Sequence, residues 1–319
     1  RRTDPYPEPP NLISASSYLI IDNPVVHARR EREMPTLSTH QIAQFSKNGY
    51  LFLEEALTNG QLQGLRQDFE KWKEESRHHS APYGDTFDGR CRFDVEPVHS
   101  FETPALRRIA SPIEISDIYL EVMRNNRALD ALEDLLGPNI KFENAKINSK
   151  LPGAATEVKF HQDFLFEAHT NDDMVTVLFF LDDVTEENGP LEVVPGSHKG
   201  PLYEHWHDGV FTGAVSDAIA AKMASKAVAC YGSAGSACLM HTRVSHGSAP
   251  NLSNAPRTLF ICEYLAEDSY PLHANHIPSK YMYEVVRGKA TGRVRCSNYE
   301  MAFPEMPTGA SFFEQQAKA

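Results

Sequence analysis

The feature that most restricts the fold of this chain is a succession of short apolar segments that begins near Ile140. Segments such as KFENAKIN, MVTVLFFLDDV and TLFICEYL are rich in β-branched and aromatic residues, and turn sequences such as ENGP and GSAGS separate them. Short apolar segments bounded by glycine and proline are typical of strands. We therefore predict a mainly β fold, either a sandwich or a jelly roll.

The residues before this region are predicted to form helices that brace the sheets. Residues 37–57 indicate a short helix, capped near Ser38 or Thr39, that leads into a strand at Tyr50–Leu53. An amphipathic helix should follow, because apolar residues recur there at steps of three and four. These residues are Leu62, Leu65, Phe69 and Trp72.

Two further segments precede the strand-rich region. Residues 114–136 are predicted to form one helix that stops at Gly137, which proline follows. Residues 78–100 show no clear period and are predicted to form a long loop, a kind of segment that often has a functional role.

We expect residues 1–319 to form a single domain. Residues 1–36, rich in proline and charge, should form an arm, and residues 37–139 should form a helical support region with its loop. The jelly-roll core is expected at residues 140–268, and residues 269–319 form a C-terminal extension.

Charge and composition narrow the range of partners. A net charge of −12 without a lysine or arginine stripe argues against nucleic-acid and membrane partners, because repulsion opposes their approach. The mean hydropathy is −0.42. A membrane-spanning helix needs about 20 apolar residues in a row, and no apolar run of this chain is close to that length. The five cysteines show no C-x-x-C spacing and predict neither a disulfide framework nor a zinc knuckle. We expect a cytoplasmic protein that acts on a small molecule, and a homo-oligomer is compatible with the sequence.

One apolar segment, VKFHQDFLF, contains a histidine and an aspartate two positions apart. On a strand, His161 and Asp163 would point to the same face and could bind one metal ion. A third ligand should come from a distant strand, and both His241 and His246 are candidates. Two histidines and one carboxylate form the facial triad of non-haem Fe(II) oxygenases, and Arg257 could hold the far carboxylate of a 2-oxo dicarboxylic acid.

Three blocks of the chain, FHQDFLF, NGPLEVVPGSHKG and MHTRVSHGSAPNLSNAPRTLFICEY, resemble the phytanoyl-CoA dioxygenase family of Fe(II)/2-oxoglutarate-dependent oxygenases. The matching blocks occur in the same order and span about residues 140–265. The resemblance implies a double-stranded β-helix core, which is a cupin-like jelly roll. It further implies that His161, Asp163 and His246 bind Fe(II), that Arg257 pairs with 2-oxoglutarate, and that O₂ is the oxidant.

The same resemblance implies roles for residues around the co-substrate. Ser248 would lie beside Arg257, Asn148 would contact 2-oxoglutarate, and Gln162 and Phe179 would border it. Because Asp163 is present, the resemblance implies hydroxylation or a related oxidation and argues against halogenation. The segment differs from the F-x-W-H-S-D-F-E-T-W-H pattern of ectoine hydroxylase, so ectoine is not predicted as the substrate.

Substrate selection is expected from residues near the metal and at the mouth of its cavity. The predicted product is a hydroxylated small polar metabolite or natural-product intermediate. The candidate substrate residues are Lys146, Phe164, Met240 and Ile261 from the barrel, and Arg90 and Arg92 from the predicted loop. For the two arginines, exposure to solvent without a substrate role is the alternative.

Two other functional classes remain open from the residues. A catalytically silent jelly-roll binding protein would share the fold, although it has no need of the three metal ligands and the arginine. A zinc hydrolase could use two histidines and an aspartate, although Arg257 would then have no role. His198 is predicted to pack on the structure at a turn. His205 and His207 could form a second metal site, as could His273 and His276, but a solvated loop with aromatic packing is favoured for both pairs.

Overall fold

The computed structural model describes residues 35–152, 156–306 and 313–316. The described residues all belong to one compact unit, Arg32–Ala319. The predicted arm, residues 1–36, lies outside the described residues except for its last two positions. No helix in the described part of the chain is long and apolar enough to cross a membrane.

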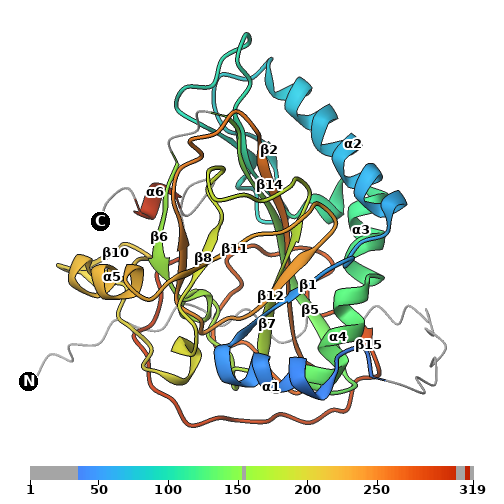
Figure 1. Ribbon diagram of the computed structural model, residues 1–319, viewed down its shortest axis with the longest axis vertical. Coiled ribbons are helices and arrows are strands. Elements are labelled where there is room, and N and C mark those ends of the chain that lie inside the picture. Colours follow the sequence, from blue (N-terminus) through green and yellow to red (C-terminus); the bar gives the residue numbers. More distant parts are fainter. Residues whose placement is uncertain (1–34, 153–155, 307–312, 317–319) are drawn as a thin grey trace, which may run out of the picture. The chain divides into compact units, whose positions relative to one another are not determined.

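Two antiparallel sheets form the core of the compact unit (Figure 1). The larger sheet has the order β1-β12-β7-β14-β5-β4-β3-β2, with β15 beside β5, and the smaller has the order β11-β8-β13-β6. The larger sheet consists of β1 (Tyr50–Leu53), β2 (Tyr83–Asp85), β3 (Cys91–Val95), β4 (Leu106–Ala110), β5 (Ile140–Lys150), β7 (Met174–Phe180), β12 (Ala237–His241), β14 (Arg257–Ala266) and β15 (Val285–Arg287). The smaller consists of β6 (Val158–His161), β8 (Leu191–Val193), β11 (Val228–Cys230) and β13 (His246–Ser248). The predicted mainly β, jelly-roll class is confirmed.

Helices cover the outer face of the larger sheet, where α2, α3 and α4 run beside it in Figure 1. The first two helices begin at capping boxes, one formed by Ser38 with Gln41 and the other by Thr58 with Gln61. A capping box satisfies backbone N–H groups that a helix start leaves unpaired, so these four residues fix where the helices begin. The helices are α1 (Thr39–Asn48), α2 (Asn59–Ser76), α3 (Asp117–Arg124), α4 (Arg127–Leu136), α5 (Asp217–Ala224) and α6 (Phe313–Gln316).

The main hydrophobic core lies between this helical layer and the larger sheet. Leu65 of α2 is fully buried there, and its carbonyl accepts a hydrogen bond of 3.0 Å from the hydroxyl of Tyr119. The Tyr119 ring meets Phe260 of β14 edge to face, with 4.8 Å between the ring centroids. A second core, which includes Leu178 and Leu259, lies on the inner face of the same sheet. Strands β7 and β14 are thus buried on both faces.

Two predicted elements differ from the structure. The single helix predicted for residues 114–136 is instead two helices, α3 and α4, because Asn126 caps the start of α4 and also bonds to the last turn of α3. Its side chain donates to the carbonyl of Val122 (2.7 Å) and accepts from the backbone N–H of Leu129 (2.8 Å). The predicted loop 78–100 contains β2 and β3, which extend the larger sheet. Strands this short offer too few residues for a period to be recognised.

Replacing Leu65 with alanine should lower the free energy of unfolding by about 2–5 kcal/mol, because it empties a fully buried position in a close-packed core. Leu252, 86% exposed, is the matched control, and Leu252→Ala should change this free energy by less than about 0.5 kcal/mol. Urea denaturation followed by circular dichroism measures both. Equal losses in the two variants would contradict the proposed packing of α2 on the sheet.

Candidate metal centre

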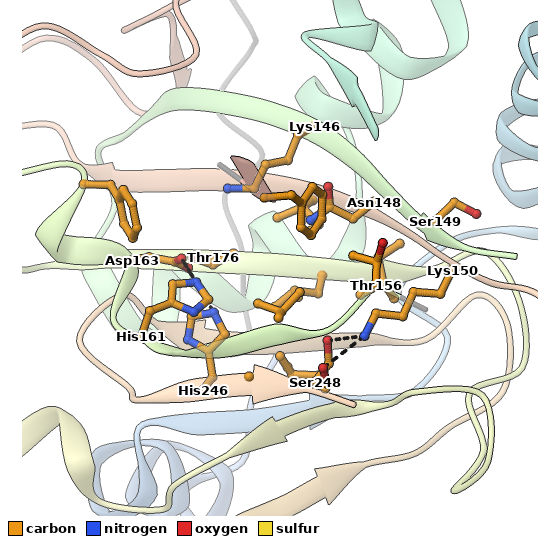
Figure 2. Close-up of a pocket in the computed structure, with 18 of the residues that line it drawn as sticks. Lys146, Asn148, Ser149, Lys150, Thr156, His161, Asp163, Thr176, His246 and Ser248 are labelled. Carbon is orange, nitrogen blue, oxygen red and sulfur yellow. Dashed lines mark hydrogen bonds and ion pairs between the residues drawn. The ribbon is translucent and has the colours of Figure 1, made fainter. Parts of the chain in front are cut away.

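His161, Asp163 and His246 lie together between the two sheets, with their candidate ligand atoms all within 4.8 Å of one another. Strand β13 pairs with β6 so that His246 lies directly opposite His161. The Nε2 atoms of His161 and His246 lie 3.4 and 3.6 Å from the same Oδ1 atom of Asp163. Figure 2 shows the two rings side by side below the carboxylate.

The route of the chain to Asp163 differs slightly from the prediction. Strand β6 ends at His161, and Asp163 begins a short 3-10 turn, Asp163–Leu165. Gln162 between them keeps an extended backbone, with φ −126° and ψ 124°. Because one extended residue separates them, the side chains of His161 and Asp163 still converge, as they would on a continuous strand.

Hydrogen bonds orient all three side chains. Nδ1 of His161 donates to the carbonyl of Lys159 (2.9 Å), and Nδ1 of His246 donates to the carbonyl of Val244 (3.0 Å). A carbonyl can only accept, so each Nδ1 carries a proton, and Nε2 is the ring nitrogen that can face a metal ion. The hydroxyl of Thr176 donates to Oδ2 of Asp163 (2.9 Å), which leaves Oδ1 for a metal ion.

The electrostatic environment favours the protonation states that a metal ion requires. Burial, with His161 nearby, lowers the pKa of His246 to about 4, so this imidazole is neutral at pH 7. Burial alone would raise the pKa of Asp163, but His246, His161 and Lys146 outweigh it and hold this pKa below its ordinary value. Neutral imidazoles and an ionised carboxylate are suitable ligands for a divalent iron ion.

The metal ligands open into a cavity between the two sheets that, with the open solvent at its mouth, contains about 810 Å³ of empty space. Arg257 of β14 lines one end, where its Nε donates to the carbonyl of Gly189 (2.9 Å) and its Nη2 to Oγ of Ser248 (3.4 Å). Lys150 of β5 lies at the same end, and its Nζ donates to the same Oγ (2.7 Å). Two buried basic side chains thus share one serine. Figure 2 shows Lys150 and Ser248 away from the two histidines.

Lys150 was not among the residues predicted for the site. Burial, with Arg257 nearby, lowers the pKa of Lys150 to about 6. The protonated amine is therefore unfavourable at this position unless an anion binds beside it. The segment KINSK contains the pattern that could have identified it. Lys146, Asn148 and Lys150 alternate along β5 and all line the cavity, whereas Ile147 packs in the core on the helical side.

The structure brings several predicted residues into the cavity wall and leaves others outside it. Lys146, Asn148, Ser248, Arg257 and Ile261 line the cavity. Gln162 does not, because its side chain holds the neighbouring backbone, donating to the carbonyl of Arg243 (2.8 Å) and accepting from the N–H of Tyr203 (2.9 Å).

Three predicted apolar residues also lie outside the described cavity wall. Phe179 packs in the core on the helical side of β7, with its ring stacked on Phe260. Phe164 packs on Tyr299, with 5.1 Å between the ring centroids, and Met240 packs in the inner core of β12. Since both faces of these strands are buried, the apolar sequence alone did not reveal which face each side chain takes.

The two predicted substrate arginines make structural contacts. Arg92 is buried, donates to the carbonyls of Ala110 and Ser111, and forms an ion pair of 2.7 Å with Glu114. Neither Arg92 nor Arg90 lines the main cavity. Arg90 pairs with Asp88 (2.7 Å) and lines a smaller neighbouring cavity.

The remaining histidines divide into buried and half-buried side chains. The aromatic packing predicted for His205 is present, with 5.7 Å between the centroids of its ring and that of Phe166. The predicted exposure to solvent is wrong, because His205 is 2% exposed and has no hydrogen bond from either ring nitrogen among the described residues. His276 is also buried, and it lines the main cavity. His241, the alternative third ligand, instead accepts a hydrogen bond from the backbone N–H of Arg243 (3.1 Å).

His246→Ala should weaken binding of Fe(II) by at least about tenfold, because it removes one of the three converging ligands. The matched control is His241→Gln, which keeps a polar side chain at the alternative position and should leave the affinity within about twofold. Anaerobic isothermal titration calorimetry measures both. Loss of binding in His241→Gln with retention in His246→Ala would contradict the ligand set.

Comparison with known proteins relates this geometry to a family. The model of the family Phytanoyl-CoA dioxygenase (PhyH) matches residues 45–259. A probable alpha-ketoglutarate-dependent hypophosphite dioxygenase of Stutzerimonas stutzeri is 34% identical over 70% of this chain and 80% of its own length. An L-proline trans-4-hydroxylase of Streptomyces griseoviridis is 28% identical over 72% of this chain and 87% of its own length.

A solved structure supports the fold independently. EctD from S. alaskensis with bound Fe superposes with a TM-score of 0.61 at 22% identity, covering 86% of this chain and 92% of that one. The matched residues 45–259 include β5, β6 and β13, and with them all three converging ligands. The resemblance of the three sequence blocks is thereby confirmed, and the chain belongs to the phytanoyl-CoA dioxygenase family.

Proposed function

We propose that this protein is an Fe(II)- and 2-oxoglutarate-dependent dioxygenase that hydroxylates a C–H bond of a small polar molecule and releases succinate and CO₂. One observation carries the proposal. A cluster of two histidines and one aspartate opens into a cavity whose far end holds two buried basic side chains, Arg257 and Lys150. A metal site alone would not require those basic groups, whereas a metal-chelating dicarboxylate does.

The ligand set fits iron. His161 and His246 present Nε2 lone pairs, and Asp163 presents one carboxylate oxygen, from the same side of the cavity. These ligands leave positions on the cavity side free for a chelating co-substrate and for O₂. No cysteine lines the described cavity, which agrees with an iron site of nitrogen and oxygen ligands.

The opposite end fits the distal carboxylate of 2-oxoglutarate. Arg257, Lys150 and Ser248 would hold it, because an arginine fork and an ammonium give charge-assisted hydrogen bonds to a carboxylate. Asn148, whose Oδ1 is buried without a hydrogen bond among the described residues, lines the wall between the two ends. Burying the guanidinium of Arg257 is costly without an anion, and a carboxylate would also favour the protonated form of Lys150, so the dicarboxylate completes this end of the cavity.

The bound iron and co-substrate supply the oxidising chemistry, in which O₂ converts 2-oxoglutarate to succinate and CO₂ and one oxygen atom is inserted into substrate. The protein orients and shields these groups. Thr176 fixes the carboxylate of Asp163, and the backbone carbonyls of Lys159 and Val244 fix the rings. Leu178, Leu191, Leu259 and Ile261 form apolar walls that exclude water.

The relatives support the reaction class and leave the substrate open. Their names specify hypophosphite and L-proline, one an inorganic anion and the other an amino acid. A substrate common to the family therefore cannot be transferred to this chain, and its own cavity residues must select the substrate.

The test is anaerobic addition of 2-oxoglutarate to the Fe(II)-loaded protein, followed by visible spectroscopy. A weak metal-to-ligand charge-transfer band should appear in the wild type and require at least about tenfold more 2-oxoglutarate in Arg257→Met. Succinate release in the presence of O₂ provides the second readout. Tight zinc binding without either effect would favour the zinc hydrolase, and no metal binding would favour the silent binding protein.

Lys150 gives the binding of 2-oxoglutarate a specific pH dependence. Burial and Arg257 lower the pKa of Lys150 to about 6, against a weaker opposite effect of Glu157, Glu192 and Glu96. Above pH 6 the free enzyme therefore holds this amine neutral, whereas a bound carboxylate favours its protonated form. The dissociation constant should rise by up to about tenfold per pH unit above pH 6, as proton uptake becomes harder.

Calorimetry between pH 6 and pH 8 in buffers of different ionisation enthalpy measures this proton uptake. Lys150→Met should bind 2-oxoglutarate more weakly at pH 6 and show little uptake. A wild type whose affinity is independent of pH across this range would contradict the role of Lys150.

A further inference from the structure

A cluster of buried carboxylates lies beyond the metal ligands, at the end of the cavity opposite Arg257. Glu143 and Glu263 belong to β5 and β14, and Glu167 follows the turn that contains Asp163. All three are at most 3% exposed, and of the three only Glu167 lines the cavity. Glu167 binds neither the metal ion nor 2-oxoglutarate in the proposed function, although it is four residues from Asp163.

A bulge in β5 explains how the carboxylates gather there. Asn144 pairs with Glu263 and Phe142 with Tyr264, so Glu143 is the extra residue in the ladder. Bulges redirect side chains, and this one leaves both Glu143 and Asn144 on the polar side while Phe142 keeps its place in the core. Asn144 then donates to Oε1 of Glu167 (2.9 Å) and to Oε2 of Glu263 (3.0 Å).

The positive charges in the cluster are unevenly distributed. Lys146 forms an ion pair of 3.1 Å with Glu263, and the buried guanidinium of Arg108 also acts on Glu263. The neighbour of Glu167 is instead His276, whose Nδ1 lies 3.0 Å from Oε1. Burial lowers the pKa of His276 well below its ordinary value, so this ring is neutral and supplies no cation.

The second oxygen of Glu167 is buried and has no hydrogen bond among the described residues. Burial, together with Glu263, raises the pKa of Glu167 well above its ordinary value, as expected for a carboxylate without a matching cation. A buried carboxylate facing a cavity under these conditions is stabilised when a ligand supplies the positive charge.

We propose that Glu167 recognises a cationic group of the substrate, an ammonium or an amidinium-like group, and holds it beside the metal centre. The proposal rests on the proposed function and names the substrate class of the same site, a small amine. Lys146 could in principle bind an anionic substrate. This alternative is weaker than recognition of a cation by Glu167, because the ammonium of Lys146 is already paired with Glu263. The ring of Phe166, which lines the cavity between His161 and His276, provides an apolar surface for the carbon skeleton.

The test measures charge selectivity with paired probes on the protein loaded with Fe(II) and 2-oxoglutarate without O₂. Each ammonium compound is compared with an analogue of similar shape that lacks the ammonium group. Propylammonium is compared with uncharged 1-propanol, and zwitterionic L-proline with tetrahydrofuran-2-carboxylate, which keeps the carboxylate and has an ether oxygen in place of the ammonium. Calorimetry should show at least one ammonium compound bound about tenfold more tightly than its analogue, the preference expected of a charged hydrogen bond. Glu167→Gln should abolish that preference and leave the affinity for 2-oxoglutarate unchanged.

The matched controls separate recognition from general effects on the cluster. Glu143→Gln changes a buried carboxylate of the same cluster that does not line the cavity, so it should keep the preference. Glu167→Asp keeps the negative charge and should retain part of the preference for cations. A wild type without any preference for cations, or a preference that persists in Glu167→Gln, overturns the assignment.

The outcomes also separate this proposal from the proposed function. Absence of the 2-oxoglutarate charge-transfer band in the wild type defeats the proposed function, whereas a normal band without cation preference defeats only the assignment of Glu167. Hypophosphite serves as the anionic probe. If it binds more tightly than every cation and Lys146→Met removes that binding, then Lys146 selects an anion and the assignment of Glu167 is wrong.

Discussion

The site depends on one cross-strand pair, in which His246 of β13 lies opposite His161 of β6. Directly opposed residues on neighbouring strands keep their side chains close, so backbone hydrogen bonds position both imidazoles. The chain then needs only one extended residue, Gln162, to bring in Asp163. Because each Nδ1 is also tied to a backbone carbonyl, the direction of the ligands is set by the main chain rather than by side-chain packing.

The larger sheet provides the complementary half of the site. Its inner face combines apolar residues such as Leu178 and Leu259 with polar residues from one row of β5. Its outer face is buried under α2, α3 and α4, which makes the central strands rigid on both sides. The polar side chains of β5 are therefore preorganised, and little conformational entropy is lost when a ligand binds to them.

Much of this arrangement could be predicted from the sequence, and the limits have physical causes. The short apolar segments predicted a sandwich or a jelly roll, and the resemblance to the family singled out the jelly roll. The same resemblance singled out His246 as the partner of His161 and Asp163, and the structure brings these three residues together. The face taken by Phe179 could not be predicted, because a strand buried on both sides shows no polar alternation. The alternation of β5 places Lys150 on the same face as Lys146 and Asn148, both of which were predicted for the site, but the resemblance to the family implied no role for Lys150.

Other features depend on contacts that no local pattern encodes. The interruption at Asn126 needs one side chain to serve two helical turns at once. The burial of His205 and His276 depends on segments far apart in the chain, and the unmatched charge of Glu167 appears only when three distant carboxylates are placed together. Such properties belong to the tertiary structure, and residue spacing does not record them.

The bulge at Glu143 also affects which insertions and deletions this enzyme can tolerate during evolution. Deleting that residue would leave Phe142 on the helical side and Asn144 on the polar side of β5, so regular alternation would be restored without shifting Lys146 or Lys150. An insertion or deletion elsewhere in β5 would turn the polar row toward the core. The strand therefore offers one position at which a change in length could remodel substrate selection while the iron and co-substrate positions are inherited intact.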